Sequence, residues 1–315
     1  MAKKYAEVST VGMSREDWLR LRRKGIGGSD AAGIAGLSKW STPYTIWLDK
    51  THRAVEKEET EPLRQGRDLE GYVAERFAEA TGKKIRKKNA VLRSTVYPWA
   101  QANVDRLIVG ENAGLECKTT AALDLRKFHD VEFPEQYYAQ CLHYLAVTGA
   151  DRWYLAVLVL GREFHTYVLE RDEEEISALM RIEEKFWELV TEDRAPAPNG
   201  SDADTEAITA IYRESREDTV ELFGREEMLN ERAELIRQQK ELDARIAEIE
   251  NTIKQDMQDA ERGEIGRFRV SWKTQTRKTF QAKEFARAHP EVALDPFYRE
   301  SVSRPFKITE TKEPA

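Results

Sequence analysis

Apolar residues recur at helical spacing in several stretches of the chain. Between residues 61 and 80 they stand four apart, at Leu69, Val73 and Phe77, and the stretch ends at Gly82. This spacing places the apolar side chains on one face and predicts a long amphipathic helix. Similar patterns predict shorter helices over 14–24, 31–37 and 44–50, and longer ones over 134–147 and 172–192.

Short runs of apolar and β-branched residues, separated by turn residues, predict strands. Gly110 and Asn112 supply the turn between two of these runs. The run 153–160 is continuously apolar, which is typical of a strand buried on both faces, and 163–169 would pair with it as a hairpin. Because helices and strands are mixed, we expect an α/β fold. The predicted strands of this segment are 90–97, 102–109, 113–119, 153–160 and 163–169.

The pattern changes after this α/β segment. Residues 195–201 are rich in Pro, Ala, Asn, Gly and Ser, which is typical of a linker. Farther on, apolar residues stand 7, 4, 3, 4 and 4 apart among charged ones, which predicts a coiled-coil-like helix that Gly263 ends. These apolar residues are Leu235, Leu242, Ile246, Ile249, Ile253 and Met257. The expected parts are an α/β domain at 1–194, a linker with a short helix at 195–224, the long helix at 225–262 and a tail at 263–315.

The tail is predicted to be a small α+β extension. We expect two strands at 266–274 and 276–282, a short helix at 283–288 and a last strand at 303–309.

The expected parts of the chain also differ in net charge. The whole chain holds 50 basic and 57 acidic residues, a net charge of −7, but residues 170–262 alone hold 13 basic and 28 acidic residues. The front and the tail are therefore basic, so the negative average does not exclude a nucleic-acid partner for them.

Other features exclude whole classes of protein. We see no apolar run of membrane-spanning length, and no apolar stretch follows the first lysines as in a secretory signal. The cysteines are Cys117 and Cys141, too few for a disulfide scaffold or a four-cysteine zinc site. We expect a soluble protein of a reducing compartment that does not bind membranes.

The candidate chemistry lies in two neighbouring strands. Asp105 belongs to one and Glu116-Cys117-Lys118 to the next, across a tight turn. The period of two places Glu116 and Lys118 on one face and turns Cys117 into the core. Converging carboxylates suit Mg²⁺ or Mn²⁺, and Glu70 on the long helix could add another. Taken alone, this spacing also fits solvated acids at strand ends.

Four stretches of the chain, considered together, resemble the YqaJ viral recombinase family. This family comprises the phage-type alkaline exonucleases related to lambda exonuclease. The resemblance implies a PD-(D/E)xK, or restriction-endonuclease-like, core in which helices flank a mixed β-sheet, and the tail 263–308 is similar to the extension of longer members. The stretches are RRKGIGGSDAAGIAGLSKWSTPYTIWLDK (22–50), GRDLEGYVAERF (66–77), NVDRL with LECKT (103–107 and 115–119) and FPEQYYAQCLHYLAVTGADRWYLAVL (133–158).

The family's metal site carries over by position. Asp105 matches the strand carboxylate that binds the metals, and Glu116 matches the acidic residue of the ExK element. Lys118 matches the lysine beside the attacking water, and Glu70 the helix glutamate at a second metal. Cys117 would offer only its backbone carbonyl. The proline that usually precedes the aspartate is a valine here, which changes no ligand.

The resemblance also implies DNA-binding positions. Gln140 matches the glutamine of the helix that follows the sheet. Ser29 and either Arg22 or Arg23 match the residues that hold a terminal 5′-phosphate, and the spacing leaves the arginine undecided. Further candidate DNA contacts are Gln136 and Tyr137 beside the glutamine, and Lys87 and Lys88 in a basic run.

The implied activity is a Mg²⁺- or Mn²⁺-dependent 5′→3′ exonuclease on double-stranded DNA, with two ions in each site. It would leave 3′ overhangs for a single-strand annealing protein, in the cytoplasm of a bacterium that carries the phage or prophage. Relatives form a trimeric ring. An endonuclease, or a non-catalytic DNA-binding or assembly protein on the same fold, are the alternatives. The acidic helix could form a hairpin, brace the domain, join two copies or dock a partner.

Overall fold

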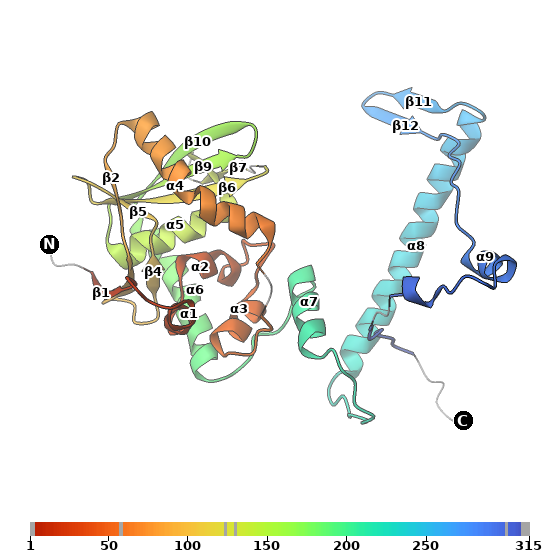
Figure 1. The fold of residues 1–315 in the computed structure, drawn as a ribbon, viewed down its shortest axis with the longest axis horizontal. Coiled ribbons are helices and arrows are strands. Elements are labelled where there is room, and N and C mark those ends of the chain that lie inside the picture. Colours follow the sequence, from red (N-terminus) through yellow and green to blue (C-terminus); the bar gives the residue numbers. More distant parts are fainter. Residues whose placement is uncertain (1–3, 57–58, 123–124, 129–130, 300–301, 310–315) are drawn as a thin grey trace. The chain divides into compact units, whose positions relative to one another are not determined.

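A mixed five-stranded sheet organises the first part of the chain, in the order β10-β9-β6-β5-β2 (Figure 1). The β6–β9 pair is parallel and the other pairs are antiparallel. The strands are β2 (Ile85–Lys87), β5 (Arg106–Ile108), β6 (Ala113–Thr120), β9 (Arg152–Val159) and β10 (Glu163–Glu170). The protein is described here by a computed structural model, which covers residues 4–56, 59–122, 125–128, 131–299 and 302–309.

Helices cover both faces of this sheet. From α4 (Glu61–Thr81), Val73 and Phe77 pack with Leu115 of β6, as the spacing predicted. On the other side, α5 (Glu135–Thr148) contributes Leu145 to a larger core with Leu155 of β9. The prediction that β9 is buried on both faces is confirmed, because it supplies residues to both cores. The mixed sheet with flanking helices confirms the expected α/β fold class.

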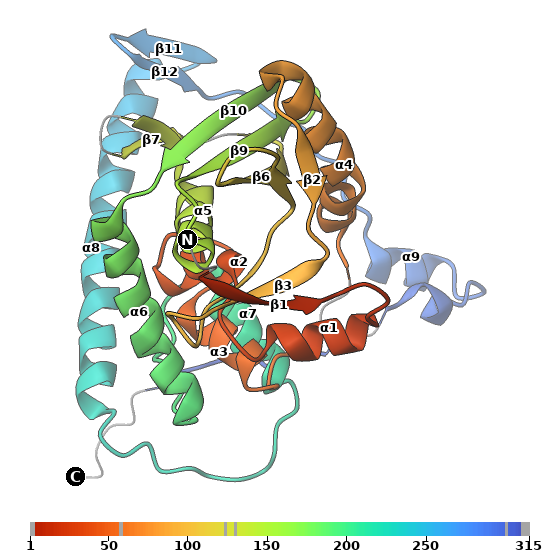
Figure 2. The same cartoon turned by 90° about the vertical axis from the view of Figure 1, so that its left-hand side faces the viewer.

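A smaller antiparallel sheet, in the order β1-β3-β4, lies near the N-terminal helices (Figure 2). The prediction of one strand over 102–109 is wrong, because its two halves belong to different sheets. The chain crosses between them at Val104, which is buried, and Asp105, which lies in a bend. The strands are β1 (Tyr5–Ser9), β3 (Ala90–Ser94) and β4 (Gln101–Asn103), with a separate hairpin of β7 (Leu125–Phe128) and β8 (Val131–Pro134).

The remaining helices of this part pack around these sheets. The structure divides into two units, Met1–Arg213 and Glu214–Ala315, so α7 belongs with the first unit although the sequence placed it in the linker. Asp204 of α7 fixes it there, because its buried carboxylate accepts hydrogen bonds from the Thr42 hydroxyl and from the Asn199 amide, the latter at 2.6 Å. These helices are α1 (Arg15–Arg22), α2 (Gly28–Ile34), α3 (Pro43–Lys50), α6 (Glu173–Thr191) and α7 (Asp202–Ile211).

The second unit holds the long helix and the tail. The helix ends at Met257 and not at Gly263, because Gln258 has a left-handed backbone (φ 49°). The tail strands also differ from the expected 266–274 and 276–282, since the hairpin turns at Gly266, and 303–309 form no regular structure. The elements are α8 (Glu226–Met257), β11 (Arg262–Ile265), β12 (Phe268–Ser271), α9 (Ala282–Ala288) and η1 (Asp295–Phe297). Across the described ranges, no helix has the length and apolar character to cross a membrane.

Candidate active site

The structure brings Asp105, Glu116 and Lys118 together. The turn at Gly110 pairs β5 with β6, which places Asp105 beside the centre of β6. The Cys117 amide donates a hydrogen bond to Asp105 Oδ2 over 2.8 Å. On the same face of β6, Lys118 Nζ lies 2.7 Å from Glu116 Oε1. The predicted alternation on β6 is therefore confirmed, and Cys117 packs among apolar residues.

Gln140 reaches this cluster from α5. Its amide nitrogen donates to Glu116 Oε1 over 2.6 Å and to the Tyr144 hydroxyl over 2.8 Å. The Tyr144 hydroxyl in turn donates to the Asn103 carbonyl over 3.1 Å. Tyr144 was not identified from the sequence, although its position one helical turn after Gln140 is the signal that could have found it. This chain of hydrogen bonds fixes the carboxylate of Glu116.

Glu70 lies on the open side of the cluster. It pairs with Arg106, whose guanidinium lies 2.6 Å from Glu70 Oε1 and donates to the Asp105 carbonyl over 2.7 Å. Arg106 is a second residue that the sequence did not single out. Glu70 and Asp105 also line one groove of about 560 Å³, together with residues of α1 and of the 87–90 segment. We call it the α1–α4 groove.

Burial and the neighbouring charges shift the pKa values of the groups in this cluster. Burial raises the pKa of Asp105 well above its usual value, and the neighbouring Glu116 and Glu70 carboxylates raise it further. Burial alone would lower the pKa of Lys118, but the Glu116 carboxylate outweighs it and the pKa is raised. Lys118 therefore stays protonated at neutral pH. Burial also raises the pKa of Cys117, so its thiol stays neutral and unreactive.

The donor set fits a hard divalent cation. Three carboxylates influence one another here, and Glu116 Oε2 is buried without a hydrogen-bond partner among the described residues. A buried carboxylate oxygen without a partner is costly unless a cation approaches it. In the described part of the chain, no three acidic, histidine or cysteine side chains are already arranged as a metal site, and Arg106 and Lys118 neutralise two of the carboxylates instead.

A second, smaller pocket adjoins the groove and distinguishes the two arginines. Arg22 lines this pocket and donates to the Ser29 hydroxyl over 3.0 Å. Arg23 does not line it: its guanidinium binds Asp49 at 3.1 Å and His52 at 3.2 Å. We call this space of about 110 Å³ the end pocket, lined by Trp18, Arg22, Gly27, Gly28, Ser29, Val91, Gln101, Asn103 and Tyr144. Trp18 and Asn103 also line the α1–α4 groove, so the two hollows are neighbours.

A buried ion-pair network around Asp30 holds Arg22 of the end pocket in place. Asp30 is buried and binds Lys50 at 2.6 Å and Arg22 at 3.1 Å, and it accepts the Gly27 amide at 2.9 Å. Although burial favours the neutral acid, Lys50 and Arg22 lower the pKa of Asp30 to about 2. Asp30 therefore stays charged and orients Arg22. The sequence did not single out Asp30 or predict this ion pair.

A second buried pair connects the pocket to α6. His143 and Glu183 are fully buried, with His143 Nδ1 2.8 Å from Glu183 Oε1 and Nε2 3.0 Å from the Gln101 carbonyl. Both ring nitrogens lie beside oxygen atoms that can accept hydrogen bonds, an arrangement that favours the protonated imidazolium. Burial lowers its pKa, but Glu183 raises it more, and the net pKa is above the usual value. The side chain of Gln101 binds the Arg22 carbonyl at 2.6 Å, which positions the end of α1.

The other residues predicted to contact DNA lie in two different places. Lys87 and Lys88 both line the α1–α4 groove, and Lys88 forms an ion pair with Glu7. The Tyr137 ring lies under Lys118, whose nitrogen is 5.5 Å from the ring centroid. Gln136 belongs to α5, but its side chain lies outside the described residues. The structure therefore places the two lysines in the same groove as Glu70 and Asp105, and Tyr137 next to Lys118.

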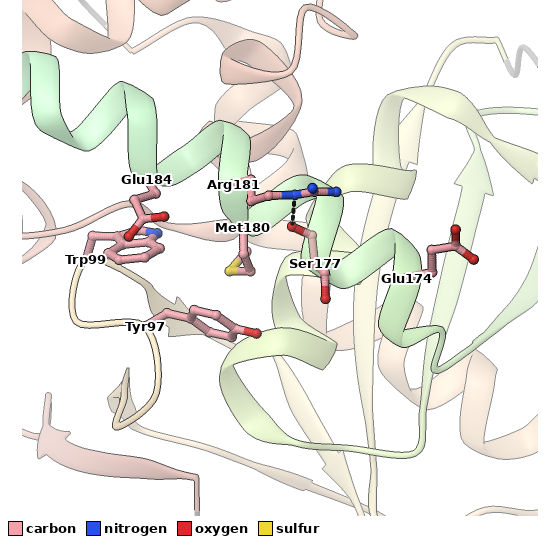
Figure 3. A pocket seen from close by; sticks show the side chains of 7 residues that line it. All are labelled: Tyr97, Trp99, Glu174, Ser177, Met180, Arg181 and Glu184. Atoms are coloured by element: carbon pink, nitrogen blue, oxygen red, sulfur yellow. Dashed lines mark hydrogen bonds between the residues drawn. The ribbon is translucent and has the colours of Figure 1, made fainter.

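A hollow of about 460 Å³ lies between α6 and the 95–100 turn (Figure 3). Its aromatic side is formed by Tyr97 and Trp99, and its rim carries Glu174 and Glu184. Arg181 of this rim donates to a carbonyl of its own helix, at Ser177, over 3.2 Å. The carboxylates would repel a phosphate backbone. The α1–α4 groove carries lysines, Lys87 and Lys88, where this hollow carries carboxylates.

Two solved structures match the chain at low sequence identity. An alkaline exonuclease (LHK-Exo) from Laribacter hongkongensis is 14% identical, with a TM-score of 0.43, over 56% of this chain and 93% of that chain. A putative exonuclease from Eubacterium rectale is 12% identical, with a TM-score of 0.44, over 67% of this chain and 96% of that chain.

Sequence comparison gives a much closer match. The model of the YqaJ-like viral recombinase domain matches residues 17–151, which include Asp105, Glu116 and Lys118. An uncharacterized protein YqaJ from Bacillus subtilis (strain 168) is 41% identical over 318 residues, or 98% of this chain and 99% of that protein. The resemblance noted in the sequence is confirmed. The chain therefore belongs to the YqaJ-like viral recombinase family.

Proposed function

We propose that this protein is a metal-dependent deoxyribonuclease with a PD-(D/E)xK site. The observation that carries the proposal is the cluster of Asp105, Glu116 and Lys118, in which a buried Glu116 oxygen has no partner within the described residues. Carboxylates can hold divalent cations, and an adjacent protonated lysine stabilises the negative charge that develops on the phosphate during phosphodiester hydrolysis.

Glu70, Asp105, Glu116 and the Cys117 carbonyl are the groups that would hold Mg²⁺ or Mn²⁺, with two ions in each site. When bound, such ions lower the pKa of water and neutralise the charge of the scissile phosphate. To bind a metal ion, the Glu70 carboxylate must give up its ion pair with Arg106 or keep it through one oxygen only. The Glu116 carboxylate must likewise bind the metal ion and Lys118 at the same time. Both ion pairs link single side chains, so they can rearrange without a change of fold.

The protein's own side chains have separate tasks. Lys118 keeps its proton, so it donates a hydrogen bond to the attacking water or to a phosphate oxygen and does not act as a base. Gln140 keeps Glu116 in place through one short hydrogen bond. Cys117 provides its amide to Asp105, and its neutral thiol takes no part.

The end pocket supports exonuclease action. Arg22 and Ser29 can both donate to a terminal 5′-phosphate, and the guanidinium can bind two oxygens at once. Tyr144 lines this pocket and is linked through Gln140 to Glu116, so a held end lies close to the carboxylates. Lys87 and Lys88 on the groove would contact the backbone of the duplex.

We therefore propose 5′→3′ digestion of one strand from a double-stranded end, which leaves 3′ overhangs. A single-strand annealing protein would receive them, in recombination of phage type within the bacterial cytoplasm. A ring of three copies, as inferred from the family, would let DNA pass through the centre. Endonuclease action is the alternative on the same cluster.

The test uses linear duplexes that carry a label at either the 5′ or the 3′ end of one strand, and a covalently closed circle, each with Mg²⁺. The proposal predicts early loss of the 5′ label as mononucleotides, late loss of the 3′ label and an intact circle. Cutting of the circle at the rate of the linear duplex would establish the endonuclease instead. No cleavage with Mg²⁺ or Mn²⁺ would refute a nuclease and favour a DNA-binding protein.

A further inference from the structure

The tail carries a strip in which basic and aromatic side chains are interleaved. Between Arg267 and Lys283 the sequence RFRVSWKTQTRKTFQAK has six basic residues and no acidic one. The strip covers β12, the irregular residues that follow it, and the start of α9. This concentration of positive charge is sharper than in any segment of the acidic helix α8 before it, and nothing in the proposed nuclease site uses it.

The strip is open to solvent along its length. Its aromatic side chains are 60% exposed at Phe268, 47% at Trp272 and 69% at Phe280. All six basic residues are exposed as well: Arg267, Arg269, Lys273, Arg277, Lys278 and Lys283. Single exposed aromatic residues are common on protein surfaces, but three of them among six cations within 17 residues form a patch of mixed character. The strip therefore has the character of a binding surface.

Few acids compete for its positive charge. Within the described residues, Arg269 lies 3.5 Å from Glu264 and Lys273 lies 4.0 Å from Glu261, both at the strip's first half and both largely exposed. Such exposed pairs contribute little and exchange easily. Arg267 lies instead over the ring of Phe268, 5.1 Å from its centroid. A polyanion can displace these contacts at low cost.

We propose that residues 267–283 bind single-stranded DNA. Positive charges attract the phosphates, and aromatic rings stack on bases, which are free only in an unpaired strand because the bases of a duplex stack on one another. The choice of the unpaired strand rests on the proposed function, since 5′→3′ digestion produces one. The strip would hold the new 3′ strand.

Anionic membranes are the other polyanionic surface that attracts basic and aromatic residues. They favour an amphipathic helix with its charges on one face and its apolar groups on the other. Here most of the strip is strand and irregular chain, and charges and rings follow each other closely in sequence. The arrangement favours a strand of nucleic acid, with a ring for a base and a cation for a phosphate.

The test measures binding of a labelled single-stranded oligonucleotide by fluorescence anisotropy, with the full chain carrying Glu116→Gln and a chelator present to prevent cleavage. Trp272→Ala with Phe280→Ala should weaken binding at least about fivefold, as the loss of one stacked base would. The plot of log K against log salt has a negative slope, and Arg277→Ala with Lys278→Ala should make that slope less steep by about 1.4. Phe223→Ala, an aromatic residue 84% exposed outside the strip, is the matched control and should change neither.

The binding measurements distinguish the proposal from its alternatives. Unchanged single-strand binding in both strip variants would overturn the proposal, and so would a strip-dependent preference for blunt duplex or for phosphatidylglycerol vesicles over the oligonucleotide. Because no metal or cleavage is involved, this result is independent of the nuclease assay. An inactive wild-type chain whose strip still binds the oligonucleotide would refute the proposed function alone.

Discussion

Replacing Arg22 with alanine should erase the preference for 5′-phosphorylated DNA ends, whereas replacing the adjacent Arg23 should not. Arg22 faces the end pocket with its side chain one third exposed, and Arg23 is bound to Asp49 outside it. A hydrogen bond to a charged group contributes about 1.5–3 kcal/mol, so the loss of Arg22 should reduce the rate ratio roughly 10- to 150-fold. Lys50 still neutralises Asp30 at 2.6 Å, so the fold should survive.

The assay measures initial rates on linear duplexes with 5′-phosphate and 5′-hydroxyl ends. The variants are Arg22→Ala, Arg23→Ala and Ser29→Ala, and the last should lose a smaller factor because a hydroxyl donates an uncharged hydrogen bond. Arg22→Ala should keep slow cleavage, since the carboxylates are untouched. A wild-type ratio near one, or an equal loss in the Arg23 variant, would show that the end pocket does not hold the phosphate.

Three further predictions follow from the site. Lys118→Ala should lower kcat about 100-fold or more and leave the Kd for duplex DNA unchanged, because its proposed role is to stabilise charge that develops in the reaction; a rise in Kd as large as the fall in kcat would contradict this. Gly28→Ala should cost about 1–3 kcal/mol in urea unfolding, since the new Cβ would lie 2.5 Å from the Tyr144 ring; wild-type stability would disprove that close contact. The folded state raises the pKa of both His143 and Glu183, so it binds more protons than the unfolded chain, and stability should fall as pH rises above 6.5 through the raised pKa of His143. Replacing both residues by Gln should flatten this fall in urea titrations between pH 6 and 9, and an unchanged pH dependence would refute the buried pair.

Local patterns predicted the centre of the site. The alternation of β6 and the turn before it depend on a few consecutive residues, so Glu116, Lys118 and the approach of Asp105 could be read from the sequence. Gln140 needed the family resemblance, and without it Glu70 was only a possible further carboxylate, because each comes from a separate helix. The structure brings these residues into one region, while their catalytic roles stay predictions.

Tertiary packing decides which arginine lines the pocket and which buried charges pair, and neither could be predicted from the sequence. Arg22 and Arg23 are neighbours, and successive residues of a helix point about 100° apart, so only the placement of α1 decides which one reaches the pocket. The pairs His143–Glu183 and Asp30–Lys50 are 40 and 20 positions apart in sequence. No local spacing predicts such buried pairs, because the packing of whole helices forms them.

One measurement tests the central claim most directly: the Mg²⁺-dependent release of nucleotides from a 5′-phosphorylated linear duplex, compared between wild type and Glu116→Gln. Gln140 and Lys118 both bind Glu116 Oε1, so the isosteric amide should keep the fold, which circular dichroism can verify. We predict rapid release by the wild type, none without Mg²⁺ or Mn²⁺, and a loss of at least about 100-fold in the variant. Release at the wild-type rate by folded Glu116→Gln protein would contradict the assignment of this carboxylate cluster as the nuclease site.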